Sequence, residues 1–353
     1  MKLVSIVGAR PQFIKAAPVS RVWRQTHTEI LIHTGQHYDE EMSAVFFREL
    51  NIPEPDYNLA VGSGPHGRQT GQMLARIEEV LLKEQPDWVL VYGDTNSTLA
   101  GALAAVKLHI PVAHVEAGLR SFNRTMPEEH NRVLTDHCAD LLFCPTQTAV
   151  DWLAQEGITR GVHLVGDVMY DAVLYNVDLA QQRSTILAEL GLHAQDFLLA
   201  TIHRPYNTDD PKRLQNILTA FLEIGDPIIF PVHPRTRRYI AALDTDFDHS
   251  NIKMIAPVSY LDMLALEQHA RLILTDSGGV QKEAYFLAVP CATLRPETEW
   301  VETVQTGWNL LVNADVEQIV RAANAHQWPA QSPQPVFGDG RAAEKISKIL
   351  HNI

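Results

Sequence analysis

Short apolar runs alternate along the whole chain with longer stretches in which apolar residues recur every three or four positions. Runs such as Trp88–Tyr92 and Leu272–Thr275 have the length of buried strands, and the stretches between them have the period of amphipathic helices. This alternation is typical of βαβ units, in which helices cover both faces of a parallel sheet. The pattern therefore predicts an α/β protein.

The candidate strands form two groups of similar size. In the first half of the chain they are 3–7, 29–33, 88–92, 111–115, 141–144 and 163–165, and in the second half 197–202, 228–232, 252–255, 272–275, 290–294 and 309–312. About six strands are enough for one doubly wound sheet, so we expect two Rossmann-like domains with a cleft between them.

The polar helical stretch from Asp171 to Asp196 predicts the connection between the two domains. We expect an N-terminal domain at 1–168, a C-terminal domain at 169–340 and a hinge near 167–172. The run 341–350 has the apolar spacing of an amphipathic helix and follows a Pro/Gly-rich stretch. We expect the final helix, 341–353, to return to the first domain.

Length and composition narrow the class of protein. The 353 residues exceed what one hydrophobic core usually serves, and 46% apolar with 20% charged residues is typical of a soluble globular protein. The apolar runs are too short to span a membrane, and the apolar part of residues 1–8 is too short for a signal peptide. Cys138, Cys144 and Cys291 have neither metal-site spacing nor the number that a disulfide framework needs. We therefore expect a cytoplasmic enzyme.

The net charge of −13 and the absence of a basic run argue against nucleic-acid and anionic-membrane partners. The overall charge does not exclude a small anionic ligand, which needs only a few local cations.

Polar residues follow many of the predicted strand ends, which is where open α/β sheets bind ligands. These segments are Gly8-Ala9-Arg10-Pro11-Gln12, Gly93-Asp94-Thr95-Asn96, Glu116-Ala117-Gly118-Leu119-Arg120, His203-Arg204, His233-Pro234-Arg235 and Asp276-Ser277-Gly278-Gly279. Each alone has an ordinary explanation as a turn or helix cap. Together they favour a binding cleft.

The first of these segments has one glycine, so it is neither G-x-G-x-x-G nor a Walker A loop. This argues against nicotinamide, flavin and P-loop enzymes. Arg10 and Lys15 lie in the opening turns of the next helix, where cations oppose the helix dipole. They indicate a bound anion, unless both simply point to solvent.

Ser277, Gly278 and Gly279 lead from an apolar strand into a helix, where exposed backbone N–H groups let a diphosphate approach. Glu283, one to two turns further on, has the place of an acid that accepts hydrogen bonds from a ribose diol. The ordinary alternatives are a turn and an exposed helix acid.

Asp94, Glu116 and Glu128 are predicted around one site, where neighbouring carboxylates can supply an acid and a base. Glu128 also fits an ordinary helix start with acids in its first turn. A metal is the alternative ligand of three carboxylates, but none of them has the His or Asp spacing of a metal motif. We therefore expect no metal.

A larger set of motifs spans essentially the whole chain. It comprises Gly8-Ala9-Arg10-Pro11 with Lys15, Gly93-Asp94-Thr95, His114-Val115-Glu116-Ala117-Gly118-Leu119-Arg120, Pro127-Glu128-Glu129 with Asn131-Arg132, Thr201 with His203-Arg204, Asp276-Ser277-Gly278-Gly279 with Gln281 and Glu283, and Leu294-Arg295 with Thr298-Glu299. In order and spacing, this set resembles the non-hydrolysing UDP-N-acetylglucosamine 2-epimerase family.

The resemblance implies two Rossmann-like domains of the glycosyltransferase-B type, working as a homodimer, with a UDP-sugar between the domains. It implies interconversion of UDP-GlcNAc and UDP-ManNAc, a precursor step for surface polysaccharides, without a redox cofactor. The C2 hydrogen of a pyranose has no adjacent carbonyl, so direct deprotonation is not credible. Family chemistry instead eliminates UDP and adds it back to a glucal-type intermediate, which needs a base and a stabilised diphosphate.

Carried over by motif, Asp94, Glu116 and Glu128 resemble the catalytic carboxylates of the family, and His203 resembles its active-site histidine. The ligand-binding positions of the family correspond to Arg10, Lys15, Ser277, Gly278, Gly279, Glu283 and Arg295.

Three segments depart from the family pattern. UDP-GlcNAc-specific members read His-Arg-x-Glu-Asn and Thr-Glu-Arg-Pro-Glu, where this chain has His203-Arg204-Pro205-Tyr206-Asn207 and Thr298-Glu299-Trp300-Val301-Glu302-Thr303. Trp300 removes a cation expected near the nucleotide, and its segment resembles relatives that act on UDP-2,3-diacetamido-2,3-dideoxyglucuronate. Members activated by a second UDP-GlcNAc read Gln-His-x-Gln, where this chain has Gln36-His37-Tyr38-Asp39.

Three further functions remain compatible with the sequence. A hydrolysing epimerase would release UDP and free sugar, and a glycosyltransferase would need an acceptor site. A nucleotide-sugar sensor would need no acid or base, whereas the catalytic positions here are all filled.

Overall fold

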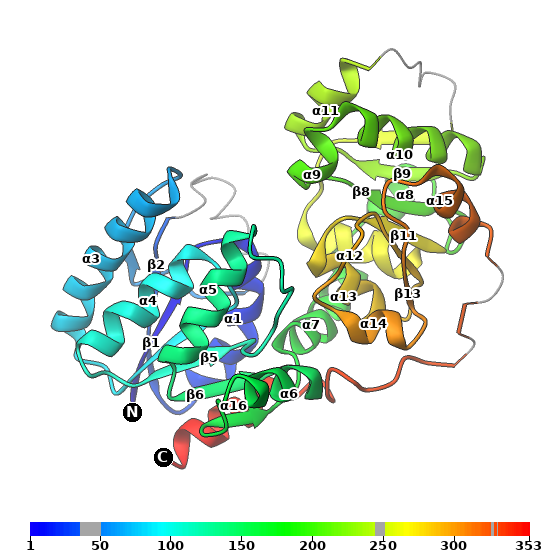
Figure 1. The fold of residues 1–353 in the computed structure, drawn as a ribbon. Helices are drawn as coiled ribbons and strands as arrows, with labels where there is room; N and C mark the ends of the chain where they lie inside the picture. Colours follow the sequence, from blue (N-terminus) through cyan, green and yellow to red (C-terminus); the bar gives the residue numbers. More distant parts are fainter. Residues whose placement is uncertain (36–50, 244–250, 326–327, 330) are drawn as a thin grey trace. The chain divides into compact units, whose positions relative to one another are not determined.

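The computed structural model describes residues 1–35, 51–243, 251–325, 328–329 and 331–353 (Figure 1). These residues form two compact units: unit 1 is residues 1–174 with 335–353, and unit 2 is residues 175–334. The boundary lies inside helix α7 (Val168–Arg183), and the chain rejoins unit 1 at Pro335. Each unit is built on a parallel sheet flanked by helices, so the predicted α/β class with two Rossmann-like sheets is confirmed.

The sheet of unit 1 has the order β3-β2-β1-β4-β5-β6-β7, with every neighbouring pair parallel. Its strands are β1 (Lys2–Val7), β2 (Thr28–His33), β3 (Tyr57–Asn58), β4 (Trp88–Tyr92), β5 (Val112–Val115), β6 (Leu141–Cys144) and β7 (Val162–Leu164). All except β3 were expected; β3 has two residues and no apolar run to mark it.

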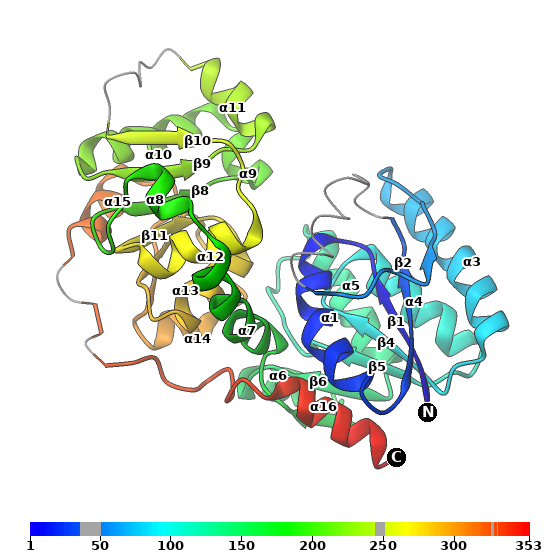
Figure 2. The same ribbon diagram turned by 180° about the vertical axis from the view of Figure 1, so that it is seen from behind.

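The helices of unit 1 are α1 (Arg10–Trp23), α3 (His66–Glu84), α4 (Asn96–Lys107), α5 (Pro127–Cys138), α6 (Gln147–Gln155), the start of α7, and α16 (Ala342–His351). Figure 1 shows α3, α4 and α5 on the near face of this sheet, and Figure 2 shows α1 and α16 on the opposite face. The C-terminal helix α16 packs against α1 and belongs to unit 1.

Unit 2 repeats the same strand order, β10-β9-β8-β11-β12-β13, again all parallel. Its strands are β8 (Leu198–Thr201), β9 (Ile228–Pro231), β10 (Ile252–Ile255), β11 (Leu272–Thr275), β12 (Cys291–Thr293) and β13 (Asn309–Leu311). Its helices are the end of α7, α8 (Ile186–Leu190), α9 (Pro205–Thr208), α10 (Pro211–Ile224), α11 (Pro234–Ala241), α12 (Tyr260–His269), α13 (Gly278–Phe286), α14 (Val301–Gln305) and α15 (Val316–Ala323).

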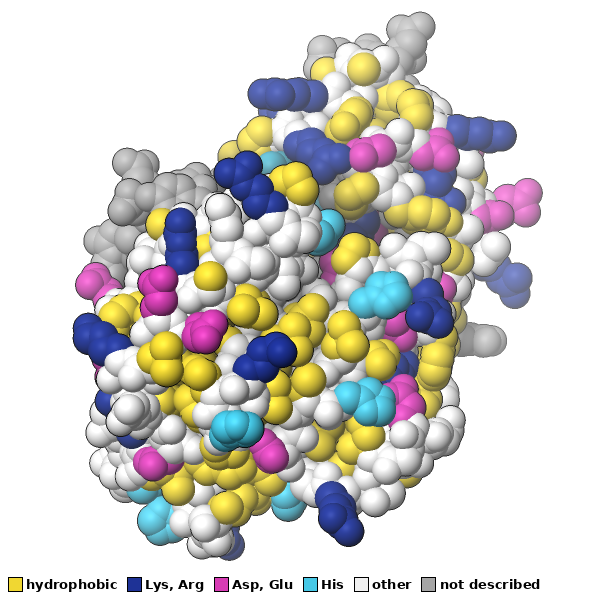
Figure 3. Space-filling model, turned by 60° about the vertical axis from the view of Figure 1, so that its left-hand side comes forward, with side chains coloured by type: hydrophobic (Ala, Val, Ile, Leu, Met, Phe, Trp, Pro, Cys, Tyr) yellow, Lys and Arg dark blue, Asp and Glu magenta, His cyan; other side chains and the backbone are white. Residues whose placement is uncertain are grey.

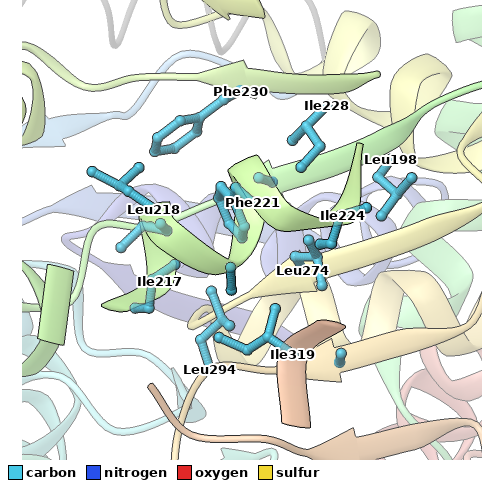
Figure 4. Packing of buried hydrophobic residues seen from close by; sticks show 14 of the residues in the cluster. Leu198, Ile217, Leu218, Phe221, Ile224, Ile228, Phe230, Leu274, Leu294 and Ile319 are labelled. Carbon is cyan, nitrogen blue, oxygen red and sulfur yellow. The ribbon is translucent and has the colours of Figure 1, made fainter. Parts of the chain in front are cut away.

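The core of unit 2 shows why its strands are apolar throughout. Leu198 and Ala200 point into the layer that contains α10 and α15, whereas Leu199 points into the layer that contains α12 and α13. Both faces of β8 are therefore buried, as period-two side-chain alternation in a covered parallel strand requires. In the first layer Phe221 of α10 meets Phe230 of β9 edge to face, with ring centroids 6.2 Å apart (Figure 4).

Among the helices of the described residues, none is long and apolar enough to cross a lipid bilayer.

Candidate active site

Both sheets have a topological switch point, where the chain leaves two adjacent central strands in opposite directions. These points lie between β1 and β4 in unit 1 and between β8 and β11 in unit 2. Ligands of open α/β sheets bind at the carboxyl ends of such strands. In unit 1 the candidate residues follow β1, β4 and β5, and in unit 2 they follow β8, β11 and β12.

The turn after β1 is held by Gln12, which is almost fully buried. Its Oε1 accepts hydrogen bonds from the backbone N–H groups of Gly8 (2.8 Å) and Ala9 (3.1 Å), and its Nε2 donates to the carbonyl oxygen of Tyr92 (2.7 Å). The same amide therefore fixes the end of β1 against the end of β4. Arg10 is the first residue of α1; its side chain lies outside what the structure describes.

Lys15 forms an ion pair with Glu116, with 2.6 Å between Nζ and Oε1. Their side chains are only 11% and 5% exposed, so the alternative that Lys15 points to solvent does not hold. Glu116 has φ of +69°, a left-handed conformation that costs a non-glycine residue about 1 kcal/mol. The fold therefore holds this carboxylate in a strained turn, directly beside a buried cation.

Asp94 is held by α5. Its Oδ2 accepts from Nε (3.0 Å) and Nη2 (2.7 Å) of Arg132, and its backbone oxygen accepts from Asn131 Nδ2 (2.9 Å). Arg132 is buried and Asp94 is partly exposed, so the carboxylate is fixed on one side and accessible on the other. Asp94 and Glu116 thus end neighbouring strands, and each is paired with its own cation.

The first turn of α5 carries two adjacent acids, of which Glu129 has a structural role and Glu128 is accessible. Glu129 is buried and accepts from Ser121 N, Phe122 N and Arg132 Nη1. Burial raises the pKa of Glu129, but these hydrogen bonds outweigh it and leave the pKa below its ordinary value. Glu128 is half-buried, and its carboxylate has no hydrogen bond or ion pair with any described residue.

All the buried residues of α5 are polar: Glu129, Asn131, Arg132, Thr135 and Asp136. A cavity of about 390 Å³ opens beside the first turn of this helix. It is lined by residues at the N-terminal ends of α3, α4 and α5: His66, Gly67, Thr70, Gly71, Asn96, Pro127, His130 and Asn131.

In unit 2, Asp276 organises the turn after β8. This fully buried carboxylate accepts from His203 N (3.1 Å), Arg204 N (3.0 Å) and Asn207 Nδ2 (3.1 Å), and lies 3.5 Å from His203 Nδ1. Burial lowers the pKa of His203 below its ordinary value, and the charges of Arg204 and His233 add to this, while Asp276 opposes it. The half-exposed His203 ring thus has a buried carboxylate beside its Nδ1.

The loop after β11 leads into α13 as expected, with Ser277 as the N-cap; its Oγ accepts from Val280 N. Gly278 packs closely, since a Cβ there would lie 2.9 Å from Glu299 Oε1. Gly278 and Gly279 are the first two helical residues, so their N–H groups belong to the unsatisfied end of the helix.

Glu283 is buried rather than an exposed helix acid, and its Oε1 accepts from the hydroxyl of Tyr260 (2.9 Å). Glu267 lies on α12, the helix that carries Tyr260, and is fully buried. Neither of its carboxylate oxygens has a hydrogen-bond partner among the described residues. Burial and the charge of Glu283 raise the pKa of Glu267 well above its ordinary value. Its surroundings therefore favour the neutral form of Glu267 over the charged one.

Arg295 follows β12 and is buried, with its Nη2 donating to Glu299 Oε2 (3.0 Å). Its Nη1 is buried without a partner among the described residues, so the guanidinium has a donor to spare for an anion. A cation from another position lies beside Trp300. The ammonium of Lys282, itself buried, lies 3.9 Å from the centre of the Trp300 indole.

Three supporting residues were not foreseen as site residues: Gln12, Arg132 and Asp276. Each acts across strands, on partners far away in sequence, so no local pattern marks it. The one available signal is that Gln12 and Asp276 lie inside the polar segments that follow strand ends, and Arg132 lies inside the larger motif set. The segment Gln36-His37-Tyr38-Asp39 lies outside the described residues.

Comparison with known proteins agrees with this geometry. A sequence model of the UDP-N-acetylglucosamine 2-epimerase family matches residues 21–351. The chain is 56% identical to a UDP-N-acetylglucosamine 2-epimerase homolog of Methanococcus maripaludis, with 100% of both chains covered. It is 52% identical to the UDP-2,3-diacetamido-2,3-dideoxy-D-glucuronate 2-epimerase of Pseudomonas aeruginosa, with 99% of both covered.

The fold agrees with solved structures as well. The UDP-GlcNAc 2-epimerase of Methanocaldococcus jannaschii, in complex with UDP-GlcNAc and UDP, superposes with a TM-score of 0.90 at 48% identity over 100% of both chains. The expected glycosyltransferase-B type of architecture is the one these epimerases have. The chain belongs to the UDP-N-acetylglucosamine 2-epimerase family, a family of isomerases.

Proposed function

We propose that this protein interconverts the C2 epimers of a UDP-2-acetamido sugar, UDP-GlcNAc and UDP-ManNAc, by elimination and re-addition of UDP. The observation that carries the proposal is the arrangement of Asp94 and Glu116. They follow the adjacent strands β4 and β5, of which β4 borders the switch point, and each is paired with a buried cation. Two acids held in different surroundings are what proton removal and return at C2 require.

Each group has a part in the proposed reaction. Asp94 and Glu116 act beside the sugar, and Glu128, whose carboxylate has no partner among the described residues, completes the acid/base set. Arg10 and Lys15 follow β1 as cations. The product serves as a precursor of a surface polysaccharide, and the cytoplasmic location stays a prediction.

Unit 2 supplies the groups expected to hold UDP. The spare Nη1 of Arg295 and the N-terminus of α13 at Ser277, Gly278 and Gly279 suit a diphosphate, whose negative charge grows as the glycosidic bond breaks. Glu283, whose Oε1 accepts from the Tyr260 hydroxyl, suits a ribose diol. His203, oriented by Asp276, is placed at the end of β8 as a further donor to the leaving group.

The test is incubation of the purified protein with UDP-GlcNAc in heavy water, followed by NMR of the product. Inversion at C2 with deuterium incorporation is expected. D94N and E116Q are expected to lose both while remaining folded, whereas E79Q, at an exposed acid of α3, keeps wild-type rates. Wild-type exchange in both D94N and E116Q would overturn the assignment. Free sugar with stoichiometric UDP would instead identify a hydrolysing enzyme.

A second substrate is favoured by one feature. The segment Trp300-Val301-Glu302-Thr303 departs from the UDP-GlcNAc pattern and resembles relatives that act on UDP-2,3-diacetamido-2,3-dideoxyglucuronate. The same NMR assay with UDP-2,3-diacetamido-2,3-dideoxyglucuronate separates the two. A higher kcat/KM for the uronate would make it the substrate.

We also propose a homodimer formed through the α3–α4–α5 face of unit 1. Leu82, Val106 and Leu134, one on each of these helices, are exposed, and Figure 3 shows hydrophobic side chains gathered on the side of unit 1 nearest the viewer. Light scattering should give the mass of two chains, and L82E should give that of one. A monomeric wild type would refute the dimer.

A further inference from the structure

His114, in the middle of β5, is fully buried, and both its ring nitrogens face hydrogen-bond acceptors. Nδ1 lies 2.7 Å from Oδ1 of Asp136, and Nε2 lies 2.7 Å from the backbone oxygen of Gly93. A neutral imidazole has one N–H and one lone pair, so it can satisfy only one of these two acceptors. Only the imidazolium donates to both.

The alternative is a proton on Asp136, with a neutral histidine. The other carboxylate oxygen of Asp136 accepts from Gly118 N (3.1 Å) and Arg120 Nη1 (2.7 Å), which is the pattern of an ionised group. Burial alone would raise the pKa of Asp136, but the hydrogen bonds and charges of His114 and Arg120 leave it below its ordinary value. The carboxylate is therefore ionised, and the second proton belongs to His114.

The neighbouring charges fit this assignment. Arg120 is itself paired with Glu156, the residue after α6, through two bonds of 2.7 Å, so that pair is neutral and leaves Asp136 as the counterion of His114. The thiol of Cys144 on β6 has its pKa raised by burial and by Asp136, so it adds no charge. Lys15 and Glu116 neutralise each other.

The Gly93 carbonyl connects His114 to the proposed catalytic acids. Gly93 has a positive φ of +63° and is followed directly by Asp94, while Glu116 lies two residues after His114 on the same strand end. We propose that His114 is a charged positioning residue: its imidazolium holds the Gly93 carbonyl and thereby fixes the Asp94 turn relative to Glu116. The inference rests on the function proposed above for these two acids.

The hydrogen bond from His114 Nε2 to the Gly93 carbonyl, called the clamp below, depends on the second proton of the imidazolium. A neutral His114 next to ionised Asp136 keeps its proton on Nδ1, so the Nε2 lone pair would face the Gly93 oxygen and repel it. Asp136→Asn changes this balance. The amide oxygen still accepts from Gly118 and Arg120, while its N–H donates to Nδ1, so a neutral His114 carries its proton on Nε2 and keeps the clamp.

The experiment has two readouts. Histidine ¹⁵N NMR of the whole protein at about pH 8, where an unperturbed imidazole is neutral, should show both His114 nitrogens protonated. D136N should show one protonated nitrogen, Nε2, and His114→Gln identifies the signals by their loss. One protonated nitrogen in the wild type overturns the inference whether or not the protein epimerises UDP-sugars.

Kinetics supply the second readout. H114Q should lower kcat by about 10- to 100-fold with little change in KM, as expected when acids are displaced but binding in unit 2 is untouched. D136N, which keeps the clamp, should stay within a few-fold of wild type. His163→Gln, at a half-buried histidine of β7 in the same sheet, is the control. Wild-type kcat in H114Q, or equal losses in H114Q and D136N, would refute the positioning role.

Discussion

Asp171 should make the stability of unit 1 depend on pH in an unusual direction. This carboxylate lies on α7 and accepts from the backbone N–H groups of Ala342 (3.0 Å) and Ala343 (2.8 Å), at the start of α16. Burial raises its pKa to about 6 from an ordinary 3.8, because the two N–H groups offset only part of the cost and the nearby charge of Asp167 adds to it. Unit 1 is therefore less stable when Asp171 is ionised than when it is protonated.

The magnitude follows from linkage between protonation and folding. A carboxyl with a raised pKa in the folded state stabilises the fold fully below its ordinary pKa and loses that contribution as pH rises through the folded pKa. The difference between 3.8 and about 6 corresponds to about 3 kcal/mol of unfolding free energy. Nearly half of this, about 1.3 kcal/mol, is lost between about pH 5 and pH 7.5.

The perturbation is Asp171→Asn, which removes the titration and keeps one acceptor for the α16 N–H groups. The amide adds a constant offset, so the informative quantity is how the difference between variant and wild type changes with pH. We expect D171N to gain about 1.3 kcal/mol on wild type between about pH 5 and pH 7.5. Urea unfolding, with hydrogen exchange of residues 342–351 reporting on unit 1, measures it.

The matched control is Asp178→Asn, at an exposed position of the same helix, which should track wild type at every pH. A difference between D171N and wild type that stays constant across this pH range would refute the reasoning. A difference that falls as pH rises would refute its sign.

Two further predictions concern buried acids. The carboxylate of Glu29 on β2 is fully buried and accepts hydrogen bonds from Ser5, Ser20 and Arg24. E29Q should therefore lower the free energy of unfolding, measured by urea denaturation, by about 2–4 kcal/mol. An unchanged urea midpoint would count against this prediction. D276N should lower the pKa of His203 further, because the charge of Asp276 raises that pKa in the wild type. NMR titration of the His203 ring measures the change. An equal or higher pKa in D276N would contradict the prediction.

The strands and the main helices could be predicted because each is marked by its own local pattern. β4 and β11 are continuous apolar runs, and Ser277-Gly278-Gly279 marks the start of α13. Positions at strand ends could also be predicted, since the carboxyl ends of parallel strands meet at one edge.

What could not be predicted is which partner each polar side chain finds. The pairs Lys15–Glu116 and Asp94–Arg132 join elements far apart in sequence, and their formation depends on the strand order of the folded sheet. Burial of Glu283 and the stacking of Lys282 on Trp300 likewise follow from packing between elements. A helical acid or lysine carries no local sign that it will be enclosed.

The polar underside of α5 has a consequence for motion. A helix that is docked by apolar side chains can rotate or slide a little at low cost, because the hydrophobic effect has no direction. α5 is docked by Glu129, Asn131, Arg132 and Asp136, whose hydrogen bonds and ion pairs do have direction and would all stretch together if the helix moved. The helix should therefore stay fixed through the catalytic cycle, and Glu128 should reach a substrate by changing rotamer alone.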